Sequence, residues 1–324
     1  MAIFNYSALL KKIDWRKYAS FIALFVLILV SSFLSPYFLK LQNLMNILRQ
    51  VSYVGIIALG MTFVIIGGGI DLSVGSMTAF IGVIIILLMN YLGTIIGNEI
   101  IVIIICIIAG ITVGALFGAF NGFMISRGKI TPFIATLGSM AIFRSLSLYM
   151  GSASEIRSSN IIYGELGMGS FMLISVPVWV MFILTTILSL VLTNTRYGRY
   201  ICAVGSNQDV AMLSGIKVNS VKFFSYTLNG ILVAVSSILL ASRFNAVSTS
   251  NTGMGFELDA IAAVIVGGTT MTGGRGTVWG TICGAFILGI INNMLNMIGI
   301  SPYLQGTVKG IVILGAVYIQ MQKQ

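Results

Sequence analysis

The sequence has 324 residues, of which 57% are hydrophobic and only 8% carry Asp, Glu, Lys or Arg side chains. A typical soluble domain contains about 25% charged residues. If this chain folded as a soluble domain, much of its apolar surface would be exposed to water. The net charge of +10 comes from basic residues that lie between apolar runs, which indicates membrane topology and not nucleic-acid binding. The chain has no His, and its three Cys are isolated, which excludes the usual zinc patterns and a disulfide framework.

The apolar runs have the length of bilayer-spanning helices, about 20 residues each, and lack the period-2 alternation of outer-membrane barrel strands. In chain order they predict spans near 19–35, 51–68, 72–91, 100–125, 130–150, 173–193, 222–241, 258–272, 277–298 and 304–321. We therefore expect an all-α, polytopic membrane protein of about ten transmembrane helices, give or take two, because short runs broken by glycine can be re-entrant. Residues 1–324 then form a single transmembrane domain.

The basic residues predict the orientation of the chain. Four of them precede the first apolar run without a clear cleavage site, which indicates an uncleaved first span with its N-terminus inside. Twelve Lys and Arg then fall in cytoplasmic segments and four in external loops, as the positive-inside rule expects, and both termini are cytoplasmic. The twelve are Lys11, Lys12, Arg16, Lys17, Arg127, Lys129, Arg196, Arg199, Lys217, Lys222, Arg275 and Lys323; the four are Lys40, Arg49, Arg157 and Arg243; Arg144 and Lys309 lie within spans.

Two similar segments stand 200 residues apart, Val64–Gly68 and Val264–Gly268. Each is followed by a glycine-rich stretch and another apolar run. We interpret them as a same-direction internal repeat of two halves, with broken or re-entrant helices at matching places, where transporters often place binding sites. The alternative is chance in a chain rich in Gly, Ile and Val.

The first of these breaks carries a carboxylate. Three glycines interrupt the helix, and Asp71 and Ser73 follow them and are able to cap the next helix. One interpretation is a capping Asp in a cytoplasmic turn. The other is a hinge or pathway element, because a carboxylate near membrane depth is costly unless it has a purpose. The residues of interest at the two breaks are Gly67, Gly68, Gly69, Asp71, Ser73, Gly267 and Gly268.

The longest polar stretch between spans on the predicted cytoplasmic side is 195–218. Asn207, or Ser206 before it, is a good N-cap, Asp209 lies in the first turn, and Gly215 is a natural stop. These signals predict a short helix of about two turns outside the membrane. A solvated connector is the alternative, but the helix has apolar side chains that favour docking to a partner: Val210, Ala211 and Leu213.

Four segments together resemble the ribose, xylose and galactose permease family of ATP-binding-cassette importers. They are GIIALGMTFVIIGGGIDLSVGS at 55–76, TPFIATLGSM at 131–140, the 195–218 loop, and GGTTMTGGRGT at 267–277. They occur in the family's order and span most of the chain. The resemblance implies a permease dimer, homomeric or heteromeric, in a bacterial inner membrane.

The resemblance also implies partners. Cytoplasmic loops would dock onto ATPase subunits that hold ATP and Mg, and an extracytoplasmic sugar-binding protein would deliver substrate. By match, 195–218 is the coupling loop, and the residues carried over are Arg199, Gly205, Asn207, Ala211, Leu213, Ser214 and Gly215. The family's usual Ala-Ala pair is Val210-Ala211 here and the following Arg is Met212, which affects a particular ion pair with the ATPase and not docking itself.

Neutral sugars need hydrogen-bonding groups in their pathway and not a counter-charge. The polar candidates within spans are Asn121, Asn292, Asn293 and Asn296, and Asn292 and Asn296 are one helical turn apart. Interhelical hydrogen bonding is the alternative role for each of them.

Three alternatives to a sugar importer are another substrate class, an ion-coupled secondary transporter and a membrane enzyme. Related permeases carry purine nucleosides or signalling furanoses. An ion-coupled secondary transporter would need titratable groups within spans, and His is absent while intramembrane acids are scarce. No nucleophile with a base partner and no Gly-x4-Gly-Lys-Ser/Thr loop is present, so we expect a transport subunit that is not an enzyme and binds no cofactor itself.

Overall fold

The computed structural model describes residues 15–321. The predictions made for Lys11, Lys12 and Lys323, and for the side of the membrane on which the two ends lie, fall outside the described residues. The long helices of the described chain are α2 (Trp15–Leu34), α3 (Leu41–Ile66), α4 (Val74–Gly93), α5 (Glu99–Ser126), α6 (Pro132–Met150), α8 (Val176–Asn194), α11 (Val218–Phe244), α13 (Val278–Met297) and α14 (Pro302–Met321). Shorter helices are η1 (Ile162–Gly164), α7 (Glu165–Met168), α9 (Arg196–Ser206), α10 (Gln208–Leu213) and α12 (Phe256–Val266).

Each of the ten predicted spans contains one helix, and the prediction of a polytopic helical membrane protein is confirmed. Among the described residues, seven helices are long and apolar enough to cross a membrane: α3, α4, α5, α6, α8, α11 and α13. The predicted span at 258–272 is wrong as a full crossing. Its helix, α12, has 11 residues and a length of about 16 Å, roughly half the hydrocarbon thickness, because Gly267 and Gly268 end it.

The helix boundaries follow local capping chemistry. Asn98 accepts hydrogen bonds from the backbone amides of Ile100 and Ile101 at the start of α5, and Thr277 accepts one from Gly280 at the start of α13. Pro132 begins α6, where its missing N–H is harmless. The N-terminus of α3 was predicted at 51 but lies at Leu41, so Arg49 is a helical residue and not part of an external loop.

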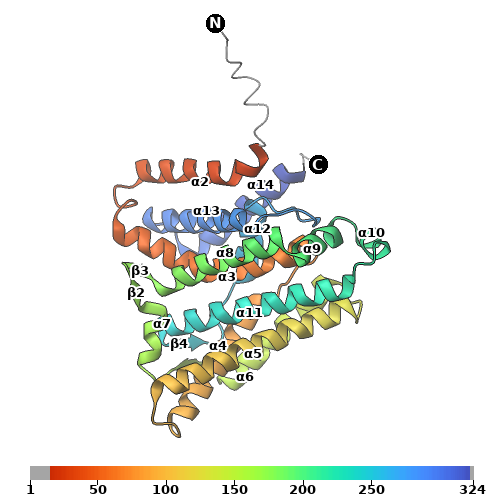
Figure 1. The fold of residues 1–324 in the computed structure, drawn as a ribbon. Coiled ribbons are helices and arrows are strands. Elements are labelled where there is room, and N and C mark those ends of the chain that lie inside the picture. The colour runs from red at the N-terminus through yellow and green to blue at the C-terminus, as the bar shows by residue number, and fades with distance from the viewer. Residues whose placement is uncertain (1–14, 322–324) are drawn as a thin grey trace.

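Four short strands were not predicted. β1 (Glu155–Arg157) pairs antiparallel with β4 (Ala246–Ser248), and β2 (Ser170–Phe171) pairs with β3 (Ile174–Ser175). Figure 1 shows the labelled strands and α7 at one end of the helix bundle and α9 and α10 at the opposite end. We call these the β end and the α10 end.

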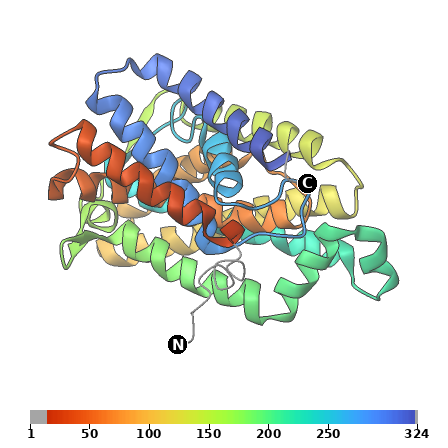
Figure 2. The same cartoon turned by 90° about the horizontal axis from the view of Figure 1, so that it is seen from above.

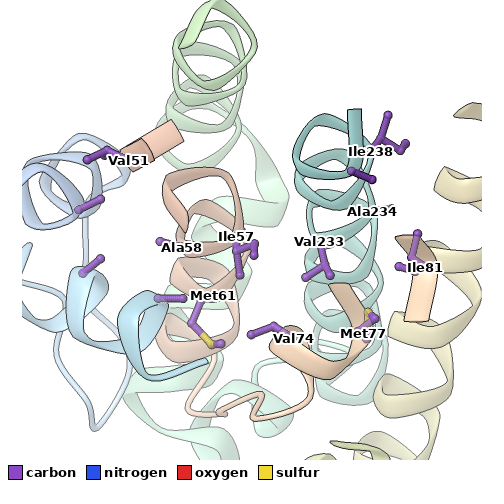
Figure 3. Close-up of a cluster of buried hydrophobic side chains, with 14 of the residues drawn as sticks. Val51, Ile57, Ala58, Met61, Val74, Met77, Ile81, Val233, Ala234 and Ile238 are labelled. Atoms are coloured by element: carbon purple, nitrogen blue, oxygen red, sulfur yellow. The ribbon is translucent and has the colours of Figure 1, made fainter. Parts of the chain in front are cut away.

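α3 and α11 form the centre of the bundle, with α2, α13 and α14 on one side and α5 and α6 on the other (Figures 1 and 2). Figure 3 shows apolar side chains of α3, α4 and α11 meeting in the main core, among them Met61, Val74 and Val233, which are fully buried. Burial of this kind holds the central helices away from lipid, whereas most residues in the apolar stretches of α5, α6 and α8 are not buried.

Glycines bring α5 and α11 into backbone contact. Gly114, Gly118 and Gly122 recur every four residues along α5, and a Cβ added at any of them would lie less than 3.0 Å from a carbonyl oxygen of α11. This spacing is the small-residue motif that lets membrane helices approach closely. The high glycine content is therefore used in part for helix packing.

Candidate substrate pathway and coupling surface

Asp71 lies in the break between α3 and α4 and is completely buried. Its Oδ1 accepts hydrogen bonds from the backbone amide and the hydroxyl of Ser73, at 3.0 and 2.6 Å, and its Oδ2 accepts one from Asn229 Nδ2 of α11, at 2.9 Å. The carboxylate thus joins the break to the centre of the bundle. Its bond to the Ser73 amide closes a turn just before α4, so Asp71 does not cap the amides of α4 as predicted.

Ser73 does not cap α4 with its side chain, contrary to prediction. Its hydroxyl donates to Asp71 and accepts from Asn121 Nδ2 of α5 at 2.9 Å, while Ser139 of α6 donates to Asn121 Oδ1 at 2.5 Å. Asn121 is fully buried within this network. Its contacts are interhelical, which matches the alternative role named for it.

The two glycine breaks have the same backbone geometry. Gly67 and Gly68 donate to the carbonyls of Phe63 and Ile65, and Gly69 donates to Val64. The amides of Gly267, Gly268 and Thr269 repeat this pattern 200 positions later, with Ala263, Ile265 and Val264 as acceptors. Gly68 and Gly268 have φ of 75° and 93°, a left-handed conformation that glycine adopts without strain.

The breaks also contact each other. Gly274, in the segment after α12, donates its amide to the Ile66 carbonyl at the end of α3, at 2.8 Å. Gly205 of α9 lies against both groups, and a Cβ added there would come within 3.0 Å of each. α9 is packed further on α3 by Phe63 and Tyr197, whose rings stack at 6.1 Å. The 195–218 segment therefore contacts both breaks through backbone atoms.

The predicted short helix in 195–218 is confirmed as α10. Asn207 Oδ1 accepts from the amide of Val210, Asp209 lies in the first turn, Ser214 follows the last helical residue, and Gly215 has φ of 79°. The structure adds a second helix before it, α9, which contains Arg199. Lys222 of α11 donates to Gln208 at 2.6 Å and ties α10 to the bundle.

The exposed surface of α10 carries three apolar side chains beside Gln208 and Asp209. Val210, Met212 and Leu213 are 57, 61 and 85% exposed, whereas Ala211 is buried against the chain itself. Such projecting apolar side chains at the polar end of a bundle are typical of a docking element. Of the predicted apolar contacts, Val210 and Leu213 are available to a partner and Ala211 is not.

A cavity of about 810 Å³ opens at the β end, between α3, α11, α12, α13 and α14. A ligand site of this size suits a small molecule. Charged and polar side chains reach its wall from several elements: Glu155, Arg157, Arg243, Asp259, Asn292 and Lys309.

The predicted asparagines of α13 differ in their surroundings. Asn293 exchanges side-chain hydrogen bonds with Asn43 of α3, at 2.8 and 3.2 Å, and Asn296 Oδ1 accepts from Gln305 of α14 at 2.7 Å. Asn292 lines the cavity, and its buried Oδ1 has no hydrogen-bond partner among the described residues. Asn292 is therefore the one of the four predicted asparagines that lines the cavity, although its Oδ1 is buried.

Two charged residues placed within spans acquire partners that the sequence did not reveal. Arg144 of α6 donates to the backbone carbonyls of Thr249, Ser250 and Thr252, at 2.9 to 3.1 Å, and so holds part of the cavity wall. Lys309 pairs with Asp259. Charges within apolar runs were the available signal, but their partners are distant in the sequence. No cluster of His, Cys, Asp or Glu suited to a metal occurs in the described part of the chain.

The comparisons with known proteins agree with this architecture. Residues 43–317 match the family described as the permease component of the branched-chain amino acid transport system. The chain belongs to this family of transport permeases. No solved structure matches the chain.

Several relatives are similar over nearly their whole length. The ribose import permease protein RbsC of Bacillus subtilis is 42% identical over 95% of this chain and 94% of its own length, and RbsC of Escherichia coli K12 is 40% identical over 94% of each. The galactose/methyl galactoside import permease protein MglC of Salmonella typhimurium is 36% identical over 98% of each. The resemblance found in the sequence is thus confirmed.

Proposed function

We propose that this chain is the membrane-spanning permease subunit of an ATP-driven importer, and that it carries a neutral monosaccharide of the ribose type into the bacterial cytoplasm. The observation that carries the proposal is the 42% identity, over 95% of the chain, to a protein named as a ribose import permease. Relatives named for allose and galactose make hexoses the nearest alternatives, followed by a nucleoside or a signalling furanose.

The cavity at the β end supports the substrate class. Its wall combines hydrogen-bonding groups with both signs of charge, and a neutral, hydroxyl-rich ligand is compatible with such a surface. In this proposal the sugar enters the cavity from an extracytoplasmic binding protein that docks at the β end. Arg144 stabilises the wall by holding the 249–252 backbone in place.

The energy comes from a separate ATPase subunit in this proposal, because the chain has no phosphate-binding Gly-x4-Gly-Lys-Ser/Thr loop. The ATPase docks on the exposed apolar side chains of α10, and α9 transmits its movement to the two breaks. A second permease protomer, identical or homologous, completes the assembly in the membrane.

We infer that the α10 end is cytoplasmic and that both termini share this side. The support is the distribution of charge: Arg127, Arg196, Arg199, Lys217 and Arg275 all belong to the segments that the positive-inside rule assigns to the cytoplasm. The localisation that follows is the inner membrane of a bacterium.

Labelling of Asn207→Cys in a Cys-free variant tests the docking surface and its side together. An impermeant maleimide should label inside-out vesicles and leave intact right-side-out cells unlabelled. Added ATPase subunit should protect the cysteine in the inside-out vesicles. Efficient labelling of intact cells would contradict the orientation, and labelling that the bound ATPase does not reduce would contradict docking at α10.

A further inference from the structure

Two oppositely charged side chains meet on the wall of the cavity. Asp259 lies in the first turn of the half-helix α12, and Lys309 lies on α14. Lys309 Nζ is 2.9 Å from each carboxylate oxygen, and the two side chains are only 18 and 26% exposed. The pair is therefore largely removed from water while it faces a cavity.

The pair retains hydrogen-bonding capacity. An ammonium group has three donors, and Lys309 uses two of them on Asp259; the two carboxylate oxygens have about four acceptor positions, of which two are used. Asn292 also lies on this cavity wall, but its Oδ1 is buried and is not open to a ligand in the cavity. Unused donors and acceptors thus line one cavity.

The rest of the wall complements these groups. Leu288 of α13, Phe256 of α12 and Leu240 of α11 supply apolar surface to the same cavity. A monosaccharide has the corresponding features, since its hydroxyls donate and accept while its ring C–H groups are apolar. An ion pair that is neutral as a whole also attracts no counter-ion to compete with a neutral ligand.

We propose that Asp259 and Lys309 form a contact site for the hydroxyls of the sugar in transit. The proposal rests on the proposed function and assigns the substrate contacts of its cavity. Asp259 accepts from a sugar hydroxyl, and Lys309 donates to a sugar oxygen. Bonds to charged partners are strong enough to orient a hydroxyl in a transient, low-affinity site.

A purely structural role for the pair would not require charge. Removing two ions from water costs several kcal/mol each, and well-packed apolar residues often replace a buried ion pair without loss of stability. An apolar contact between α12 and α14 would hold these helices together equally well. A ligand in the cavity that hydrogen-bonds to both charges gives a reason for their retention.

Exchange of the two charges separates the two roles. The double variant Asp259→Lys with Lys309→Asp keeps an ion pair between α12 and α14 but exchanges the positions of donor and acceptor on the cavity wall. In proteoliposomes with the ATPase and the binding protein, we expect ATPase stimulation by the binding protein to persist while ATP-dependent D-ribose uptake falls at least about tenfold. Lys40→Asp, a charge reversal outside the cavity wall at the same end, should transport normally.

Uptake by the exchanged pair within about twofold of the wild type would overturn the proposal and leave a structural ion pair. If the exchanged variant loses ATPase stimulation, the neutral double variant Asp259→Asn with Lys309→Gln decides the question, since it keeps polar side chains of similar size and needs no ion pair to reform. It should lower uptake about tenfold, and normal uptake would overturn the proposal. Absence of ATP-dependent uptake of D-ribose, D-allose and D-galactose by the wild-type complex would instead contradict the proposed function.

Discussion

Replacement of Gly205 by alanine is expected to abolish transport. Gly205 lies where α9 meets the Ile66 carbonyl and the Gly274 amide, and these two groups are themselves hydrogen-bonded. A methyl group would come within 3.0 Å of both, a distance that real Cβ atoms essentially never show. The neighbours are backbone atoms, so they cannot move aside as a flexible side chain would.

The expected damage is specific to the contact between α9 and the breaks. Separating α9 from the breaks would break the hydrogen bond from the Gly274 amide to the Ile66 carbonyl. Each of these two groups left unpaired costs about 1–3 kcal/mol. We expect Gly205→Ala to reach the membrane but to lose more than about 90% of ATP-dependent uptake. Gly138→Ala is the matched control, because a Cβ at Gly138 of α6 meets no atom within 4 Å.

Uptake and membrane abundance measured for both variants test this expectation. Transport by Gly205→Ala at the level of Gly138→Ala would show that α9 does not need its close approach to the breaks. The coupling route through Ile66 and Gly274 would then be wrong.

Replacement of Asp71 by alanine is expected to destabilise the whole bundle. The substitution leaves the Ser73 amide, the Ser73 hydroxyl and Asn229 Nδ2 without their acceptor in a completely buried site. Each unsatisfied buried donor costs about 1–3 kcal/mol, so the sum for the three donors is on the order of 3–9 kcal/mol. Such a loss is comparable to the whole stability of many domains.

Thermal unfolding of the purified permease in detergent measures this effect. Asp71→Ala should lower Tm by roughly 10 °C or more, since each kcal/mol shifts Tm by a few degrees in a chain of moderate size. Asp71→Asn keeps one acceptor oxygen and should lower Tm by a smaller amount. Equal Tm values for Asp71→Ala and the wild type would show that the network does not stabilise the junction of α4, α5 and α11.

The helical architecture could be predicted from the sequence because it depends on local patterns. Apolar runs of bilayer length located every long helix, and the cap signals of Asn207, Asp209 and Gly215 located α10. The span predicted for α12 was too long, because the sequence does not distinguish glycines that end a helix from glycines that interrupt a full span. β1 and β4 were missed since their pairing joins residues about 90 positions apart.

The candidate site depends on contacts between distant residues, and only its members could be predicted. Asp71 was identified, but its partner Asn229 is 158 positions away, and Asp259 and Lys309 are separated by 50. A single polar residue in a span gives no indication of which helix it faces. The four asparagines of the predicted pathway show this directly, because only Asn292 lies on the cavity wall.

The measurement that tests the central claim most directly is sugar uptake by proteoliposomes of defined composition. The permease alone should neither hydrolyse ATP nor concentrate D-ribose, and the permease with its ATPase and binding protein should do both. Uptake should persist without a sodium or proton gradient and should stop when ATP is removed. Concentrative uptake by the lone permease, driven by an ion gradient and indifferent to ATP, would contradict the importer and identify a secondary transporter.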